Sequence, residues 1–154
     1  MTHLTRRSAT FTMMAAAVAP VSVVAQTPEI WSAEMAAEAL QQDLIRMIDV
    51  RSRPEWADTG IAAGAWPISL HEDRFPERLF AAREQAEGRP VALICATGGR
   101  SGSVMRSLRK AGYSGFVDVS EGMLGSAAGP GWIAAGHPIV SMDAALTALP
   151  KDLA

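Results

Sequence analysis

The chain contains one cysteine, Cys95, and the sequence around it indicates a nucleophile. Residues 91–94 form an unbroken apolar run of the kind found in strands that are covered on both faces. Residues 101–112 have the spacing of a helix that ends at a glycine. Cys95 therefore stands between the end of a buried strand and the start of a helix. The thiolate form of cysteine is a strong nucleophile, and helix N-termini favour that form.

The residues between Cys95 and this helix are suited to holding a sulfur anion. They are Ala96, Thr97, Gly98, Gly99, Arg100 and Ser101. The two glycines allow the backbone to turn tightly and direct successive N–H groups inward, and the first N–H groups of the helix point the same way. Arg100 adds a positive charge that suits an anionic substrate, and we expect Ser101 to cap the helix.

Strand and helix patterns alternate along the rest of the chain. Strands are expected at residues 44–50, 65–69, 91–94 and 116–119, and helices begin near residues 32, 54, 75 and 101. This order predicts an α/β fold with a mainly parallel central sheet, flanked by helices on both faces, in a single domain. Ligands of such sheets bind beyond the carboxyl ends of the strands, where Cys95 is expected.

Composition excludes several other classes of protein. The chain has 154 residues, of which 49% are apolar, which suffices for one domain with a core. A net charge of −2 does not fit a nucleic-acid-binding surface. One cysteine excludes an intrachain disulfide, and the three histidines show no ligand spacing, so we expect no metal and no cofactor.

Residues 1–25 have the features of an export signal, which leaves residues 26–154 as the mature domain. Arg6 and Arg7 precede an apolar stretch at residues 13–19, and residues 23–25 are suited to signal peptidase. The stretch is shorter than the roughly 20 residues that span a bilayer, so we expect no stable membrane insertion after cleavage. The arginine pair resembles a twin-arginine signal, although an ordinary secretory signal fits equally well. Both predict export, in a bacterium to the periplasm.

The Cys95 loop resembles the active-site loop of the rhodanese family, with glycine three places and arginine five places after the cysteine. Other segments resemble the family's signatures in the family's order, over about residues 30–141. They are residues 48–51 with Glu55, residues 60–65, and residues 121–123 with Trp132, Gly136 and Pro138. The resemblance implies a rhodanese-like fold and a sulfurtransferase activity.

The resemblance also implies roles for individual residues. Cys95 would attack the outer sulfur of a small anionic donor such as thiosulfate, and the persulfide would pass its sulfur to cyanide or a thiol. The N–H groups of residues 97–101 would stabilise the sulfur anion, and Arg100 would bind the donor. Arg51 and Arg74 are further candidates for the pocket rim, although Asp49, Arg51 and Glu55 fit a structural charge network better. His71 fits a plain loop position.

Two alternatives use the same thiol. The domain could be a sulfur carrier or redox protein that serves one protein partner, and the sequence does not separate this from turnover of small molecules. Ala96 stands where the family commonly has arginine, which leaves the donor open. A cysteine phosphatase or arsenate reductase is the other alternative. Those loops place five residues between cysteine and arginine, whereas four stand between Cys95 and Arg100.

Overall fold

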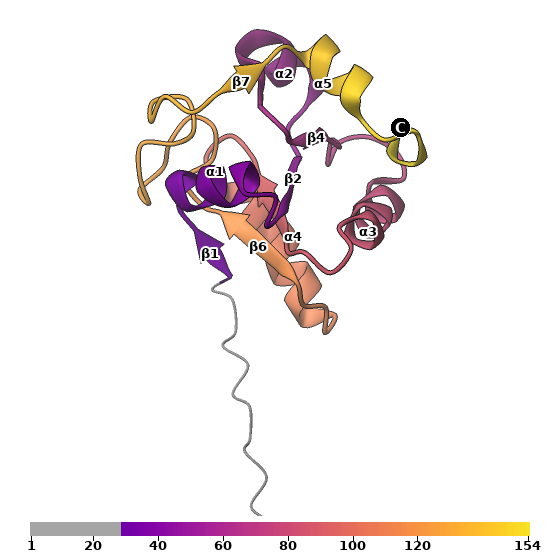
Figure 1. Ribbon diagram of the computed structural model, residues 1–154. Helices are drawn as coiled ribbons and strands as arrows, with labels where there is room; N and C mark the ends of the chain where they lie inside the picture. Colours follow the sequence, from indigo (N-terminus) through magenta and orange to yellow (C-terminus); the bar gives the residue numbers. More distant parts are fainter. Residues whose placement is uncertain (1–28) are drawn as a thin grey trace, which may run out of the picture.

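A five-stranded parallel sheet forms the centre of the structure, a computed structural model that describes residues 29–154 (Figure 1). Its strands, in spatial order, are β1 (Ile30–Trp31), β6 (Phe116–Val119), β5 (Val91–Ile94), β2 (Arg46–Asp49) and β4 (Trp66–Pro67). All neighbouring pairs are parallel. β3 (Ile61–Ala62) and β7 (Ile139–Val140) form a separate antiparallel pair.

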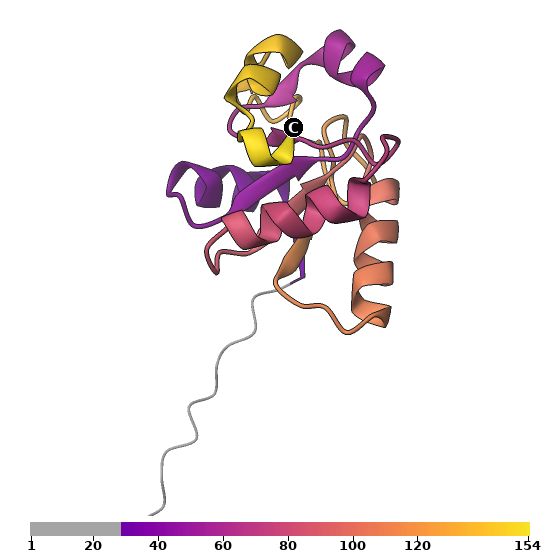
Figure 2. The same ribbon diagram turned by 90° about the vertical axis from the view of Figure 1, so that its right-hand side faces the viewer.

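Helices cover both faces of the sheet, as predicted. They are α1 (Ala33–Gln41), α2 (Arg53–Thr59), α3 (Phe75–Gln85), α4 (Gly99–Lys110) and α5 (Met142–Ala148), and a short 3-10 helix, η1 (Lys151–Leu153), ends the chain. α1 lies on one face, and α3 and α4 lie on the other (Figures 1 and 2). The predicted α/β fold with a mainly parallel sheet is confirmed.

Strand β5 divides its side chains between two apolar cores. Ala92 and Ile94 pack with α1, whereas Val91 and Leu93 pack with α3 and α4. Cys95 continues the second set. The period of two along a strand therefore places the thiol on the face that α3 and α4 cover.

Local signals account for several boundaries. The Ser32 hydroxyl accepts a hydrogen bond from the N–H of Met35 at 3.1 Å and so caps α1, which begins near the predicted residue. β4 is an edge strand, which agrees with Pro67, because proline has no N–H to donate to a neighbouring strand.

The predicted signal peptide, residues 1–25, lies outside the described residues, and the boundary at residue 26 stays a prediction. Between residues 29 and 154, no helix combines the length and apolar character that crossing a membrane requires. Within the same range, no group of three or more His, Cys, Asp or Glu side chains is arranged to hold a metal ion.

Candidate active site

Cys95 lies directly beyond the carboxyl end of β5, and its side chain points under the start of α4. The residue is 1% exposed. Its Sγ lies 3.4 Å from the Ser101 hydroxyl oxygen, and the backbone N–H groups of Thr97, Arg100 and Ser101 hydrogen bond to it. The structure therefore brings the thiol and the loop N–H groups together, as the sequence indicated.

Two opposing effects set the pKa of the Cys95 thiol. Burial raises the pKa, because the charged thiolate loses its contact with water. Hydrogen bonds from the Ser101 hydroxyl and from the N–H groups of Ser101, Thr97 and Arg100 lower it by more. The net pKa lies below the ordinary value of a cysteine, so the loop favours the nucleophilic form without exposing it.

The tight curl of the loop depends on close contact with the segment after β6. Gly98 has a φ of +82°, and a Cβ at this position would lie 2.2 Å from the Ser120 carbonyl oxygen. Backbone bonds tie the two segments together: Met123 N–H donates to the Cys95 carbonyl at 2.8 Å, and Leu124 N–H donates to that of Ala96 at 2.9 Å. A residue with a side chain cannot take the place of Gly98 without moving this backbone.

Ser101 does not cap α4, so that prediction is wrong. Because the positive φ of Gly98 turns the chain early, the helix begins at Gly99 and Gly98 itself is the N-cap residue. Ser101 then falls in the first helical turn, fully buried. Its hydroxyl donates to the Gly98 carbonyl at 3.3 Å and also contacts the thiol. The residue acts on the sulfur rather than on the helix end.

Arg100 is paired with Glu55, which the sequence did not indicate. Its Nη1 donates to Oε2 of Glu55 at 2.8 Å and its Nη2 to Oε1 at 2.5 Å. Glu55 also accepts hydrogen bonds from the Ser52 hydroxyl and N–H, which form a capping box at the start of α2. Hydrogen bonding by Arg100, helped by Ser52, holds the pKa of Glu55 far below its usual range. A carboxylate therefore offsets the positive charge beside the thiol.

We predict that Glu55→Gln raises the positive potential at Cys95. The readout is the ratio of the rate constants for alkylation by iodoacetate, an anion, and by neutral iodoacetamide. This ratio should rise about three- to fivefold, because one unit charge contributes about 1 kcal/mol at 4 Å in water. Glu77→Gln, which removes an exposed carboxylate from α3, should leave the ratio unchanged. An unchanged ratio in Glu55→Gln would show that the carboxylate does not offset Arg100 at the thiol.

His71 also lies at Arg100. Its Nε2 is 3.3 Å from Nη1 of the guanidinium. The sequence indicated only a polar loop position for this residue, because His71 and Arg100 are 29 positions apart and no local pattern predicts their contact. His71 and Glu55 thus hold Arg100 from two different segments.

The structure corrects the assignment of Arg51 to the pocket rim. Arg51 is 1% exposed, and its guanidinium donates to the Asp49 carboxylate, the Thr59 hydroxyl and the Gly60 carbonyl. With these donors in use, Arg51 is not a free cation for a substrate. The sequence grouped Asp49, Arg51 and Glu55 in one charge network. The structure has two separate ion pairs instead, Asp49 with Arg51 and Glu55 with Arg100.

Arg74 stands at the N-cap position of α3. It borders a hollow of about 300 Å³ together with Arg53, Arg78 and residues of the C-terminal segment. None of the described residues 95–101 lines this hollow. A role for Arg74 at the rim of the thiol site stays a prediction.

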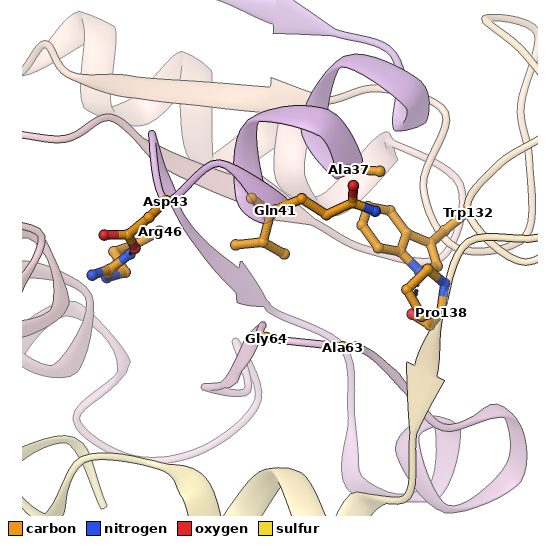
Figure 3. Close-up of a pocket in the computed structure, with 9 residues that line it drawn as sticks. Ala37, Gln41, Asp43, Arg46, Ala63, Gly64, Trp132 and Pro138 are labelled. Atoms are coloured by element: carbon orange, nitrogen blue, oxygen red, sulfur yellow. Dashed lines mark hydrogen bonds and ion pairs between the residues drawn. The ribbon is translucent and has the colours of Figure 1, made fainter.

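A second hollow of about 300 Å³ lies on the α1 face of the sheet (Figure 3). Gln41 crosses it, with Trp132 and Pro138 at one end, and Asp43 and Arg46 at the other. The last two residues form an ion pair with each other. Since Cys95 lies on the opposite face, this hollow does not serve the thiol.

Comparison with known proteins assigns the family. Residues 32–127, more than half of the chain, match the Rhodanese-like domain family. The chain belongs to this family. The rhodanese-like fold is that of a sulfurtransferase superfamily, which agrees with the loop and thiol described above.

Individual proteins are also similar to the chain. The chain is similar to a solved rhodanese-related protein from Thermoplasma volcanium, with 25% identity, a TM-score of 0.52, and coverage of 73% of this chain and 98% of that one. The fold also matches the Alr3790 protein from Anabaena sp., with 20% identity, a TM-score of 0.52, and coverage of 77% and 86%. Uncharacterized protein slr1261 from Synechocystis sp. is 33% identical over 102 residues, which is 65% of this chain and 49% of that protein. The chain thus spans about half the length of that relative.

Proposed function

We propose that this rhodanese-like protein is an exported sulfurtransferase that carries a sulfane sulfur as a persulfide on Cys95. One observation supports the proposal most. The buried sulfur of Cys95 accepts hydrogen bonds from three backbone N–H groups and lies 3.4 Å from the Ser101 hydroxyl oxygen, and this hydrogen bonding lowers the pKa of the thiol. A merely structural cysteine at a strand end needs no such donors.

The reaction divides one transfer into two displacements. In the first, the Cys95 thiolate attacks the outer sulfur of a donor such as thiosulfate; the new S–S bond forms as the old one breaks, and sulfite leaves with the bonding pair. In the second, cyanide or a thiolate acceptor attacks the outer sulfur of the persulfide, and Cys95 leaves as thiolate. The negative charge stays on sulfur at the end of each step.

The loop contributes fixed electrostatics to both steps. The N–H groups of Thr97, Arg100 and Ser101 already point at the sulfur, so they need no reorientation when the persulfide anion forms. Arg100 interacts electrostatically with the sulfur anion and is held in place by Glu55. We propose that Arg100 orients the sulfur donor with the N–H groups that do not bind Glu55.

The test is the mass of the protein after incubation with thiosulfate under non-reducing conditions. We expect a gain of one sulfur atom, about 32 Da, that cyanide or a reductant reverses and that is absent from Cys95→Ser. Because Cys95 is the only cysteine, the added sulfur has one possible thiol site.

Two negative results of this experiment are possible, and they have different meanings. An unchanged mass with a thiol that still reacts with iodoacetamide would exclude thiosulfate as the donor. An unchanged mass with an unreactive thiol would contradict the catalytic role of Cys95 altogether. Steady-state turnover of thiosulfate and cyanide with ping-pong kinetics would establish the enzyme.

A sulfur carrier for a single protein partner is the second candidate. Two observations favour it: the thiol is 1% exposed, and Glu55 offsets the charge of Arg100, which leaves little free positive charge for a small dianion. A carrier would form the persulfide and discharge it to its partner, yet turn over thiosulfate and cyanide slowly. The two functions are distinguished by comparing the rate constant for one loading of Cys95 with kcat for thiosulfate and cyanide. A carrier loads much faster than it turns over, whereas an enzyme does not.

A further inference from the structure

Asp118 on β6 is a buried carboxyl group that the proposed reaction leaves unused. The residue is 8% exposed, and among the described residues its Oδ1 atom has no hydrogen-bond partner. Phe116, two residues earlier, packs with α3 and α4, whereas Val117 and Val119 pack with α1. Asp118 therefore faces α4, on the same side of the sheet as Cys95.

Strand register brings Asp118 close to the thiol. Asp118 pairs with Leu93 on β5, and Cys95 follows Leu93 by two residues on the same face. Ser101, in the first turn of α4, reaches both groups. Its hydroxyl oxygen lies 3.4 Å from Sγ of Cys95, and the same hydroxyl hydrogen bonds to the Asp118 carboxylate and lowers its pKa.

The Ser101 hydroxyl has one hydrogen, for which the Gly98 carbonyl at 3.3 Å, the sulfur of Cys95 and the carboxylate of Asp118 compete, so it cannot donate to two anions at once. If Cys95 is a thiol and Asp118 a carboxylate, S–H donates to the hydroxyl and the hydroxyl donates to the carboxylate. If Cys95 is a thiolate, the hydroxyl donates to sulfur, and a protonated Asp118 donates to the hydroxyl. With both groups ionised, two buried anions compete for one donor, which is unfavourable.

The surroundings of Asp118 make its carboxylate a better proton acceptor than that of an exposed aspartate. Burial raises the pKa of Asp118 above the ordinary value, and the Ser101 hydroxyl and the charge of Arg106 lower it by less. Arg106 is on α4, and Arg83 of α3 lies over the ring of Phe116 on β6, with Cζ 5.5 Å from the ring centroid.

On the other side of the thiol, the charge nearest to Cys95 is Arg100. Glu55 and His71 contact Arg100. Asp49, fully buried on β2, also acts on Arg100 electrostatically.

We propose that Asp118 is a positioning residue for Cys95, one that receives the thiol proton through the Ser101 hydroxyl when Cys95 is loaded with sulfur. This inference rests on the proposed persulfide function and adds the destination of the proton. With thiosulfate as donor, the thiol of Cys95, the carboxylate of Asp118 and thiosulfate give the persulfide anion, the neutral carboxylic acid and sulfite. One proton moves from sulfur to the carboxylate oxygen, and the total charge is unchanged.

The total charge of Cys95 and Asp118 together therefore stays constant while Cys95 is loaded. In this scheme one negative charge moves from Asp118 to the persulfide as Cys95 is loaded. No proton has to reach solvent through a thiol that is 1% exposed.

The test is the pH profile of Cys95 alkylation by iodoacetamide in the full chain. We expect a wild-type profile broader than that of a single group, because coupled groups titrate in two macroscopic steps. Asp118→Asn should give a single-group profile whose midpoint is about one pH unit lower, because the competing carboxylate is gone. Asp143→Asn, which changes an exposed carboxylate on α5, should keep the wild-type profile.

A second variant keeps the inference falsifiable if Asp118→Asn does not fold. Ser101→Ala removes the connecting hydroxyl and should also narrow the profile to that of one group. A wild-type profile as steep as that of a single group would overturn the proposal, and so would an Asp118→Asn profile that coincides with the wild type. Alkylation needs no sulfur donor, so the result does not depend on whether thiosulfate loads Cys95.

Discussion

Arg51→Met is expected to lower the free energy of unfolding by about 3–5 kcal/mol, the range for removing one partner of a buried ion pair. Asp49 is fully buried, and Oδ2 of its carboxylate lies 2.7 Å from Nη2 of Arg51. Without the guanidinium, Asp49 keeps a single hydrogen bond, from the Arg51 backbone N–H to Oδ1 at 3.0 Å. The Thr59 hydroxyl and the Gly60 carbonyl also lose a donor. Urea unfolding followed by circular dichroism measures the change.

Two comparison variants separate the buried pair from general effects of removing arginine. Arg109→Met breaks an exposed ion pair with Glu29 and should cost less than about 1 kcal/mol. Asp49→Leu combined with Arg51→Met should recover much of the loss, because no charge is then left buried without its partner. A loss in Arg51→Met as small as that in Arg109→Met would refute the structural role assigned to Arg51.

The thiol and its loop could be located from the sequence because the signals are local. An apolar run predicts β5, and the run ends at Cys95, which is followed by two glycines and a helical pattern. The structure places β5 at the predicted residues and α4 two residues before the predicted start. The difference arises at Gly98, which has a left-handed backbone conformation. The types of the neighbouring residues do not show that Gly98 adopts it.

The partners of Arg100 could not be predicted, because they come from distant parts of the chain. Glu55 lies 45 residues before Arg100, and its capping box with Ser52 explains its place at a helix start but not its ion pair. The position of Asp118 on the same face of the sheet as Cys95 likewise depends on how β5 and β6 pair. A sequence pattern shows that a residue is polar within an apolar strand but does not show which group it faces.

Short strands were missed for a related reason. β1 and β3 have two residues each, too few for a period of two to be recognised, and their pairing with β6 and β7 defines them. Ala62 is fully buried although alanine is a poor strand former. Tertiary contacts, not propensity, fix these segments.

Gly98→Ala is expected to abolish the reactivity of Cys95 and to lower the free energy of unfolding by about 2–5 kcal/mol. A left-handed conformation costs a residue with a Cβ about 1–2 kcal/mol, and forcing an extra carbon into a packed site typically costs a further 1–3 kcal/mol. At Gly98 that carbon would lie 2.2 Å from the backbone oxygen of Ser120, which no side-chain rotation relieves. The loop must open, and the N–H groups of Thr97 and Arg100 then leave the sulfur.

Gly99→Ala is the matched control for this variant. A Cβ at Gly99 meets no atom within 4 Å, and the residue is the first of α4, where alanine is tolerated. The two variants add the same methyl group to adjacent residues, so only the loop geometry distinguishes them. We expect Gly99→Ala to retain wild-type alkylation and sulfur loading, measured by intact mass, while Gly98→Ala loses both. Equal reactivity in the two variants would mean that the curl of the loop at Gly98 does not create the nucleophile, and the reactivity would then have to come from the Ser101 hydroxyl alone.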